Sequence, residues 1–507
     1  MENKVKLSAS PEYTRYWQAR VVGSAETYGN SPGPLSRYFM SHGGTALPNG
    51  AAVDAMFFKN YGVNPFVDTE DDPLSTFATD VDTGSYVMIR HYLQNGNLPP
   101  EDAVRVEECI NYFHYDYLSA QEKTFNIHVD AVRSHVGRPI QNSILMRVGL
   151  HARGIENQYR KPAVLTFVID VSGSMDRENR LGLVKKSLRY LIDHLNEQDH
   201  IGIVVYGDQG RKILEPTSVA EKDKILSVIG SLSTGGATYA EQGIRMGYEM
   251  AEQAFRRGCI NRIILCSDGV ANVGMTGADQ ILEMVTGKVD KGITISSIGF
   301  GMGNYNDVLL ERLGDKGGGQ YAYVDTLLEA KRLFGENLTS TLQIVARDVK
   351  VQVEFNPEVV RSYRLIGYEN RDVPDDKFRN NKYDGGEVGS GHQVTALYVL
   401  KLWPGKNGVL ATTHLRYQDV DLEKVVEFEE SITTDAILEN IEQVDRDFRL
   451  AAVVAEFAEV LRNSYWARGI DIAQVLERLQ GTAKEFSDNH SVIEFLDLVS
   501  KARRLSS

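Results

Sequence analysis

Five oxygen-bearing side chains stand at the ends of three separate apolar stretches of the sequence. They are Asp170, Ser172, Ser174, Thr238 and Asp268. Hard cations such as Mg²⁺ prefer carboxylate and hydroxyl oxygens, and they keep several waters when protein carboxylates are few. In an open α/β sheet, the loops at the carboxyl ends of the strands converge on one crevice. We therefore expect the five side chains to meet around one divalent cation, although any one segment alone would more readily be interpreted as an ordinary turn or helix N-cap.

The segment that carries these residues has the pattern of a parallel sheet covered by helices on both faces. Between about 161 and 343, nearly continuous apolar strands alternate with amphipathic helical stretches. The expected strands are 164–169, 201–206, 263–266, 293–300 and 321–324. No Gly-x-Gly-x-x-Gly follows the first strand and no Gly-Lys-Ser/Thr loop occurs, so a nucleotide site is not expected.

Strictly alternating apolar and polar residues on both sides of this segment predict antiparallel strands. The alternation covers 125–131 and 144–150 before the segment, and 349–355, 394–400 and 409–415 after it. Period-two alternation is typical of strands with one buried face. We predict an α/β fold whose Rossmann-like, mostly parallel domain is inserted in or flanked by a β-sandwich-like domain, and a structure with two independent sheets would contradict this.

Helical patterns occupy the two remaining parts of the chain. Residues 102–112 follow Pro99-Pro100, a suitable helix start. From 434 onwards we expect helices, with Leu450, Val453, Val454, Phe457 and Leu461 on one face and Gly469 as a stop. The predicted organisation is a lead-in (1–60, extended or partly disordered), an N-terminal region (61–160), the α/β domain (161–345), a β-rich domain (346–433) and a helical region (434–507).

The composition limits the class of partner. The chain has 507 residues and a formal net charge of −14, which disfavours nucleic acid or an anionic membrane as a partner. No apolar run approaches the roughly 20 residues needed to span a bilayer, and the first 24 residues do not form a signal peptide. Three cysteines without zinc-type spacing favour a reducing compartment. We expect a cytoplasmic protein, or an exported or envelope-associated one if an N-terminal signal was removed.

The order and spacing of the five residues resemble the metal-ion-dependent adhesion site of von Willebrand factor A domains. The flanks are similar to YfbK-type bacterial proteins of that class. The similar segments are LSTF at 74–77, DVDTGSY at 80–86, LPP at 98–100, RVEE at 105–108, RLIGYENR at 364–371 and GSGHQVTALY at 389–398. The resemblance covers nearly everything after residue 70 and implies an A-domain fold with a divalent-metal site.

By this resemblance, Ser172, Ser174 and Thr238 supply hydroxyl oxygens, while Asp170 and Asp268 act directly or through water. Neutral hydroxyls cancel none of the cation's charge, so the metal can attract a carboxylate even on an acidic protein. We expect a non-catalytic module that captures an Asp or Glu of a partner protein through Mg²⁺, with Mn²⁺ or Ca²⁺ as alternatives. The sequence leaves the oligomeric state open.

Two other functions stay open. A metal-dependent hydrolase would need a general base, and Glu241, one helical turn past Thr238, is the nearest candidate by sequence. A structural scaffold would leave the metal site unused. Titration with Mg²⁺ distinguishes the scaffold, because a bound metal stabilises the folded state.

Other constellations have simpler interpretations. Asp82 lies in a single Asp-Thr-Gly, whereas an aspartic protease needs two, so we expect an Asx-type turn. Asp80 and Asp82 lack the distal Glu of a calcium loop. His114 stands in an aromatic run that predicts a packing cluster, and the glycine-rich stretch 384–391 predicts a hairpin loop.

Overall fold

The computed structural model describes Phe58, residues 60–79, 82–120, 122–236, 238–269, 275–289, 291–301, 307–381, Tyr383 and 385–506. The predicted lead-in lies outside these residues apart from its last few positions, and so does Asp80 of the calcium-loop alternative. Within the described part of the chain, no helix combines the length and the apolar character needed to cross a membrane.

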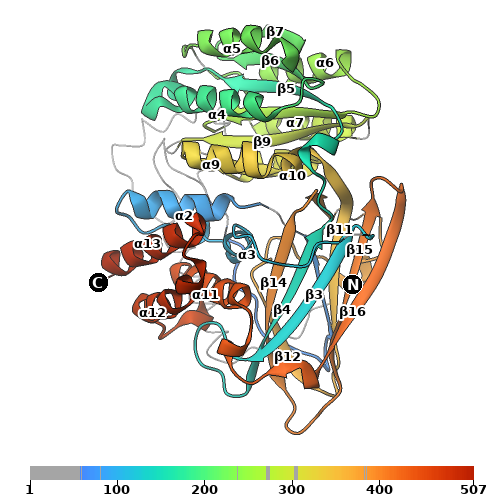
Figure 1. The fold of residues 1–507 in the computed structure, drawn as a ribbon, viewed down its shortest axis with the longest axis vertical. Helices are drawn as coiled ribbons and strands as arrows, with labels where there is room; N and C mark the ends of the chain where they lie inside the picture. The colour runs from blue at the N-terminus through green and yellow to red at the C-terminus, as the bar shows by residue number, and fades with distance from the viewer. Residues whose placement is uncertain are drawn as a thin grey trace.

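A six-stranded sheet forms the centre of the domain at the top of Figure 1, in the order β10-β9-β8-β5-β6-β7. Its strands are β5 (Ala163–Asp170), β6 (His200–Tyr206), β7 (Gly210–Ser218), β8 (Ile260–Ser267), β9 (Ile293–Phe300) and β10 (Tyr321–Val324). All neighbours are parallel except β7, which pairs antiparallel with β6 at the edge. The parallel strands confirm the predicted sheet. The prediction missed β7, whose charged residues and Pro216 suit only an edge strand.

Helices cover both faces of this sheet, as predicted. They are α4 (Arg180–His194), α5 (Lys222–Ser231), α6 (Ala240–Gln253), α7 (Met275–Val289), α8 (Asp307–Lys316), α9 (Leu327–Lys331) and α10 (Leu338–Leu342). A single π-helical turn, η6 (Arg332–Glu336), joins α9 to α10. Leu165 and Phe167 of β5 pack into the core formed with α4, α5, α9 and α10, whereas Val168 packs into the core formed with α6, α7 and α8. Strand β5 is therefore buried on both sides, which explains its continuous apolar sequence.

Below this domain, two sheets form a β-sandwich. One has the order β1-β12-β14-β4-β3-β17, and the other has the order β13-β11-β15-β16 with β2 also paired to β11. Their bounds are β1 (Val67–Asp68), β2 (Leu74–Ala78), β3 (Phe125–Arg133), β4 (Ser143–Ala152), β11 (Ile344–Phe355), β12 (Val360–Ile366), β13 (Gly386–Gly389), β14 (Gln393–Leu402), β15 (Val409–Asp419), β16 (Lys424–Thr433) and β17 (Ile437–Leu438). Strand β4, which precedes the α/β domain in the sequence, pairs with β14, which follows it. One apolar core joins the two sheets. The predicted sandwich built from both sides of the chain is confirmed.

The hairpin loop predicted at 384–391 is wrong in its middle, because Gly386–Gly389 form the edge strand β13. Strand β13 pairs antiparallel with the beginning of β11, and the chain then turns into β14. Two glycines, one glutamate and one valine give no apolar alternation, so only the pairing with β11 defines this strand.

Helices form the third part of the molecule, at the lower left of Figure 1. They are α2 (Gly84–Gln94), η2 (Glu101–Ala103), α3 (Val106–Ile110), α11 (Arg446–Leu461), η10 (Tyr465–Ala467), α12 (Ile472–Ala483), η11 (Lys484–Phe486) and α13 (His490–Leu505). The five apolar residues predicted to share one helix face all lie on α11 and are buried.

Three helix boundaries differ from the prediction. The helix expected at 102–112 is split by Arg105, whose extended backbone N–H donates to the hydroxyl oxygen of Ser85. Residues 434–445 are not one helix but two short turns, η8 (Thr434–Ala436) and η9 (Ile441–Gln443), on either side of β17, which pairs with β3. Helix α11 ends at Leu461, and Asn463 rather than Gly469 takes the first left-handed conformation after it, at φ 50°.

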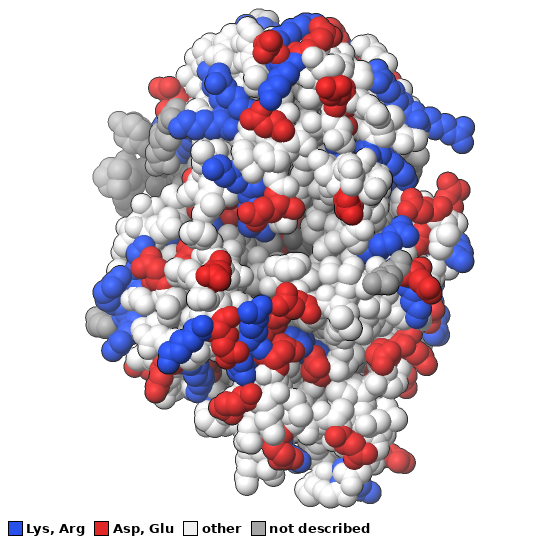
Figure 2. All heavy atoms as spheres, in the orientation of Figure 1, with Lys and Arg blue, Asp and Glu red and all other residues white. Residues whose placement is uncertain are grey.

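The face shown in Figure 2 carries Lys and Arg interspersed with Asp and Glu. Neither sign of charge forms a continuous field on this face. A polyanion such as nucleic acid needs a clustered basic surface, so this face provides no support for such a partner.

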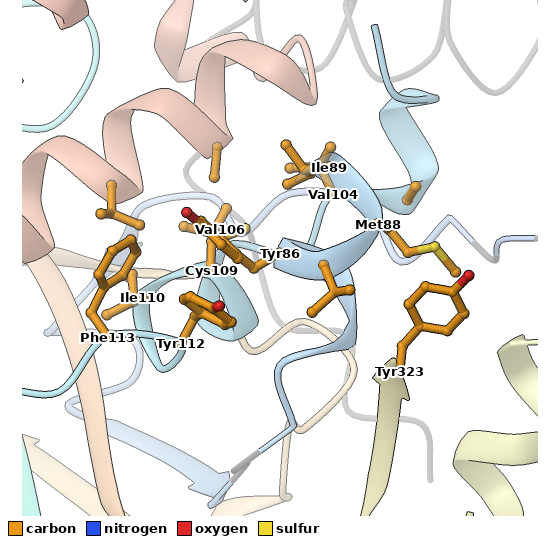
Figure 3. Packing of buried hydrophobic residues seen from close by; sticks show 14 of the residues in the cluster. Tyr86, Met88, Ile89, Val104, Val106, Cys109, Ile110, Tyr112, Phe113 and Tyr323 are labelled. Carbon is orange, nitrogen blue, oxygen red and sulfur yellow. The ribbon is translucent and has the colours of Figure 1, made fainter. Parts of the chain in front are cut away.

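Helix α2 joins the α/β domain to the helical part (Figure 3). Met88 points toward Tyr323 of the edge strand β10, while Tyr86 stacks on Tyr112 with ring centroids 3.9 Å apart. Phe113 meets Tyr86 edge-on, and His114 is exposed. The aromatic run is therefore a packing cluster, as predicted.

Two buried polar groups strengthen the same junction. Arg90 of α2 is ion-paired with Asp325 and Glu329, which follow β10, at 2.5 and 3.0 Å. Asp82 accepts hydrogen bonds from the backbone N–H of Tyr321 at 3.2 Å and from Arg371 at 3.1 Å. The carboxylate of Asp82 thus links the start of α2 to two distant segments, a role that the turn prediction did not include.

Candidate metal centre

Strands β5 and β8 lie side by side and bring Asp170 and Asp268 to the same end of the sheet. Asp170 is the last residue of β5, and Asp268 directly follows β8. The strands are parallel, with Ile169 opposite Cys266, so their carboxyl ends coincide. This is the arrangement that the sequence predicted for residues almost one hundred positions apart.

A continuous series of hydrogen bonds connects four of the five predicted residues. The backbone N–H of Ser172 donates to Asp170 Oδ1 at 2.8 Å, and the hydroxyl oxygens of Ser172 and Ser174 are 3.0 Å apart. The Ser174 hydroxyl donates to Asp268 Oδ1 at 3.2 Å. The other oxygen of Asp170, Oδ2, accepts from the Ser267 hydroxyl at 3.2 Å. Two carboxylates and two hydroxyls therefore share one small volume.

Thr238 follows a loop that lies against the segment carrying Ser172 and Ser174. The loop before α6 is fixed to the loop after β5 by two backbone hydrogen bonds, from Gly235 N–H to the Val171 carbonyl at 2.8 Å and from Gly173 N–H to the Gly236 carbonyl at 3.1 Å. Thr238 is half-buried, and among the described residues its side chain makes no hydrogen bond to the other four. The structure joins four of the residues by direct bonds, and the bonds of Gly235 and Gly236 bring the loop before Thr238 against the same segment.

The charged form of Asp170 is destabilised by its surroundings in a way that a cation would relieve. Asp170 is fully buried and Asp268 is 2% exposed. Burial, followed by the negative charge of Asp268, raises the pKa of Asp170 to about 6, against the opposing effect of its hydrogen bonds. The donors are hydroxyls and carboxylates, and among the described residues no group of three or more His, Cys, Asp or Glu side chains could hold a metal. The residues therefore fit a hard cation such as Mg²⁺ and do not fit a zinc site.

A buried arginine, which the sequence analysis missed, contacts one of these carboxylates. Arg180, the first residue of α4, donates from Nη1 to Asp268 Oδ2 at 2.6 Å, and both side chains are 3% exposed. Asp170 has other partners, the Ser172 N–H and the Ser267 hydroxyl. The guanidinium thus neutralises one oxygen of one carboxylate and leaves Asp268 Oδ1 with Ser174. The position of Arg180 at a helix start six residues after Ser174 was the available signal, but sequence spacing does not define the direction of a long side chain.

Glu241, the base of the hydrolase alternative, forms an ordinary helix-surface ion pair. Its carboxylate lies 3.0 Å from the guanidinium of Arg245, four residues further along α6, and the two side chains are 45% and 60% exposed. Such pairs are common on solvent-facing helices. The geometry provides no support for a general base at this position.

Comparison with known proteins agrees with this architecture. The family model described as "von Willebrand factor type A domain" matches residues 165–343, and the model described as "Uncharacterized protein YfbK, C-terminal" matches 340–409 and 403–505. A further model, "von Willebrand factor", matches residues 52–139. The match to the type A domain model covers the α/β domain and includes all five candidate residues.

Relatives match over very different lengths. The Escherichia coli (strain K12) protein called "Uncharacterized protein YfbK" is 34% identical over 471 residues, which are 88% of this chain and 80% of that protein. The human inter-alpha-trypsin inhibitor heavy chain H3 is 27% identical over 154 residues, 29% of this chain and 17% of that protein. A solved structure, "von Willebrand factor type A from Catenulispora acidiphila", aligns with a TM-score of 0.44 at 16% identity, covering 74% of this chain and 91% of that one.

Proposed function

The chain belongs to the family of YfbK-type proteins with a von Willebrand factor A domain, and we propose that this domain captures a carboxylate of a partner protein through a divalent cation. Domains of this type typically mediate protein–protein interaction. The observation that carries the metal proposal is the series of hydrogen bonds that joins Asp170, Ser172, Ser174 and Asp268. Asp170 is buried beside a second carboxylate, which makes its negative charge costly, and a cation among these oxygens would offset that cost.

The proposed ligands keep the roles that the resemblance implies. Ser172, Ser174 and Thr238 provide hydroxyl oxygens, and Asp170 and Asp268 bind directly or through water. A bound Mg²⁺, Mn²⁺ or Ca²⁺ would supply a positive charge that attracts a carboxylate. The hydrogen bonds from Ser172 and Ser267 hold the carboxylate of Asp170, so its orientation is set before a metal binds. We propose binding without catalysis, because Glu241, the candidate base, is engaged in an exposed ion pair with Arg245.

The test compares metal-dependent stability and metal-dependent capture. Mg²⁺ at 100 times its dissociation constant should stabilise the wild-type chain by about 2.7 kcal/mol, and the melting temperature should rise with saturation. Asp170→Ala and Thr238→Ala should melt cooperatively but show no response to Mg²⁺. Asp193→Ala is the matched control, since Asp193 is an exposed carboxylate paired with Lys222 on the same domain.

Capture of partner proteins is then measured in parallel with Mg²⁺ and with EDTA. The proposal predicts capture with Mg²⁺ only, and its loss in both site variants. Equal capture under the two conditions would contradict it. Turnover of generic phosphoester or peptide substrates that disappears in Asp170→Ala would replace binding by hydrolysis.

One observation favours a second function, that of a scaffold without metal. Arg180 already places a positive charge on Asp268 at 2.6 Å. If the melting temperature of the wild-type chain does not change with Mg²⁺, Mn²⁺ or Ca²⁺, the arginine alone balances the site and the scaffold is the better description.

A further inference from the structure

We propose that Arg180 sets the charge of the metal-loaded site, so that the site keeps one net positive charge and selects an anionic ligand. This inference rests on the proposed function, since it concerns the same cation. Arg180 acts through Asp268 and is a positioning residue.

The contact between Arg180 and Asp268 is built into the fold. Both side chains are 3% exposed, and their atoms Nη1 and Oδ2 are 2.6 Å apart. The turn after β9 closes on the stem of the arginine, because a Cβ added to Gly301 would lie 2.2 Å from Arg180 Nε. Gly301 also has φ +83°, which an alanine adopts only with strain. The backbone at this turn therefore leaves space for the arginine and for little else.

The arginine divides the two oxygens of Asp268 between two tasks. Oδ2 accepts from Arg180, and Oδ1 accepts from Ser174. A carboxylate held at both oxygens cannot rotate freely, so Oδ1 stays on the side of the serine hydroxyls. A cation placed among the serines would meet this one oxygen rather than both.

The charges of the buried groups then determine what the loaded site attracts. Two carboxylates alone would neutralise a divalent cation completely. With the guanidinium of Arg180 included, the cation and these three side chains together carry one net positive charge. Asp176 and Asp208 near the site are exposed, and water screens them more than the buried groups. A carboxylate from outside restores neutrality, whereas a Lys or Arg side chain is repelled.

A purely structural role for Arg180 predicts a different result from the charge role. If the arginine only held the loop in place, its loss would weaken the binding of both the metal and the anion. If it sets the charge, its loss removes a repulsion from the metal and an attraction for the anion, so the two affinities change in opposite directions.

The experiment measures Mg²⁺ binding to the full chain by calorimetry, with and without sodium acetate as the carboxylate probe, at constant ionic strength. Arg180→Gln keeps a hydrogen-bond donor without the charge, and Arg180→Lys keeps the charge. We expect Arg180→Gln to bind Mg²⁺ roughly tenfold more tightly, the scale of cation repulsion across a few ångströms of a wet crevice. The enhancement of Mg²⁺ binding by acetate should be lost in this variant, and Arg180→Lys should retain wild-type behaviour.

A second variant covers the case in which Arg180→Gln does not fold. Gly301→Ala displaces the arginine stem and should, like Arg180→Gln, strengthen the binding of Mg²⁺ and weaken that of acetate. Weaker binding of both Mg²⁺ and acetate in either variant, or no change in either affinity, would overturn the inference while leaving the metal site intact. A wild-type chain that binds no Mg²⁺ would instead refute the proposed function itself.

Discussion

Replacing Arg90 by methionine should destabilise the protein more than any exposed ion-pair substitution. Arg90 is 1% exposed and contacts Asp325 with two nitrogens, Nε to Oδ2 at 2.9 Å and Nη2 to Oδ1 at 2.5 Å. Its Nη2 also contacts Glu329 at 3.0 Å. One cation of the helical part thus contacts two buried carboxylates of the α/β domain.

The magnitude follows from what the substitution leaves behind. Removing one partner of a buried ion pair costs about 3–5 kcal/mol, because the remaining charge is buried without compensation. Glu329 retains Arg332, whose Nη2 lies 2.6 Å away, whereas Asp325 loses its bidentate partner. We therefore expect a loss at the lower end of this range, about 3 kcal/mol of unfolding free energy.

Urea denaturation of Arg90→Met and of the matched control Arg133→Met provides the measurement. Arg133 pairs with Glu439 at 2.9 Å, but these side chains are 46% and 67% exposed, so the control should cost at most about 1 kcal/mol. Hydrogen exchange should accelerate in α2 and β10 of Arg90→Met only. A loss below about 1 kcal/mol in Arg90→Met, or equal losses in the two variants, would refute the reasoning.

Three further outcomes test other parts of the structure. Burial alone would raise the pKa of Glu459, but the charge of Arg462 outweighs it together with other contacts, and the pKa is lowered to about 2. The ionised carboxylate therefore stabilises the folded protein by up to about 3 kcal/mol above pH 4.5. In denaturation curves, the advantage of the wild type over Glu459→Gln should disappear as the pH falls from 4.5 to 2. The buried hydroxyl of Tyr248 has no hydrogen-bond partner among the described residues. Tyr248→Phe should therefore leave the unfolding free energy unchanged or raise it by up to about 1 kcal/mol. A decrease of the unfolding free energy by more than about 1 kcal/mol would indicate that a water molecule binds the hydroxyl. Gly137 and Gly96 have similar positive φ angles, +84° and +76°, but of these two only Gly137 would place a Cβ against backbone, 2.4 Å from a carbonyl oxygen. Gly137→Ala should therefore lower the melting temperature more than Gly96→Ala, which costs about 1 kcal/mol. Equal shifts would show that the neighbouring backbone moves to accommodate the methyl group.

Periodicity in the sequence was sufficient to predict the large elements of the fold. The continuous apolar runs became β5, β6, β8, β9 and β10, and the alternating runs on both sides became the sandwich. Seven strands were missed, namely β1, β2, β7, β12, β13, β16 and β17. Of these, β7, β13 and β17 depend on their neighbours and not on an apolar pattern of their own. The same cause explains the helix wrongly expected directly after Thr433.

Chemistry at strand ends was sufficient to predict most of the candidate site. Asp170, Ser172, Ser174 and Asp268 come together because parallel neighbouring strands end together. Arg180 was not predicted, since its contact with Asp268 depends on the course of a long side chain past the turn at Gly301. Tertiary packing alone determines that course.

The pairing of β4 with β14 has a consequence for synthesis of the protein. Ser143 pairs with Lys401, so 258 residues separate two strands that are hydrogen-bonded neighbours. The whole A domain lies between them and is synthesised before β14. At a translation rate of about 5–20 residues per second, the unpaired edge of β4 waits roughly 13–50 s for its partner. During this interval the nascent chain exposes a strand edge, and chaperones that recognise extended segments would find their target between residues 143 and 152.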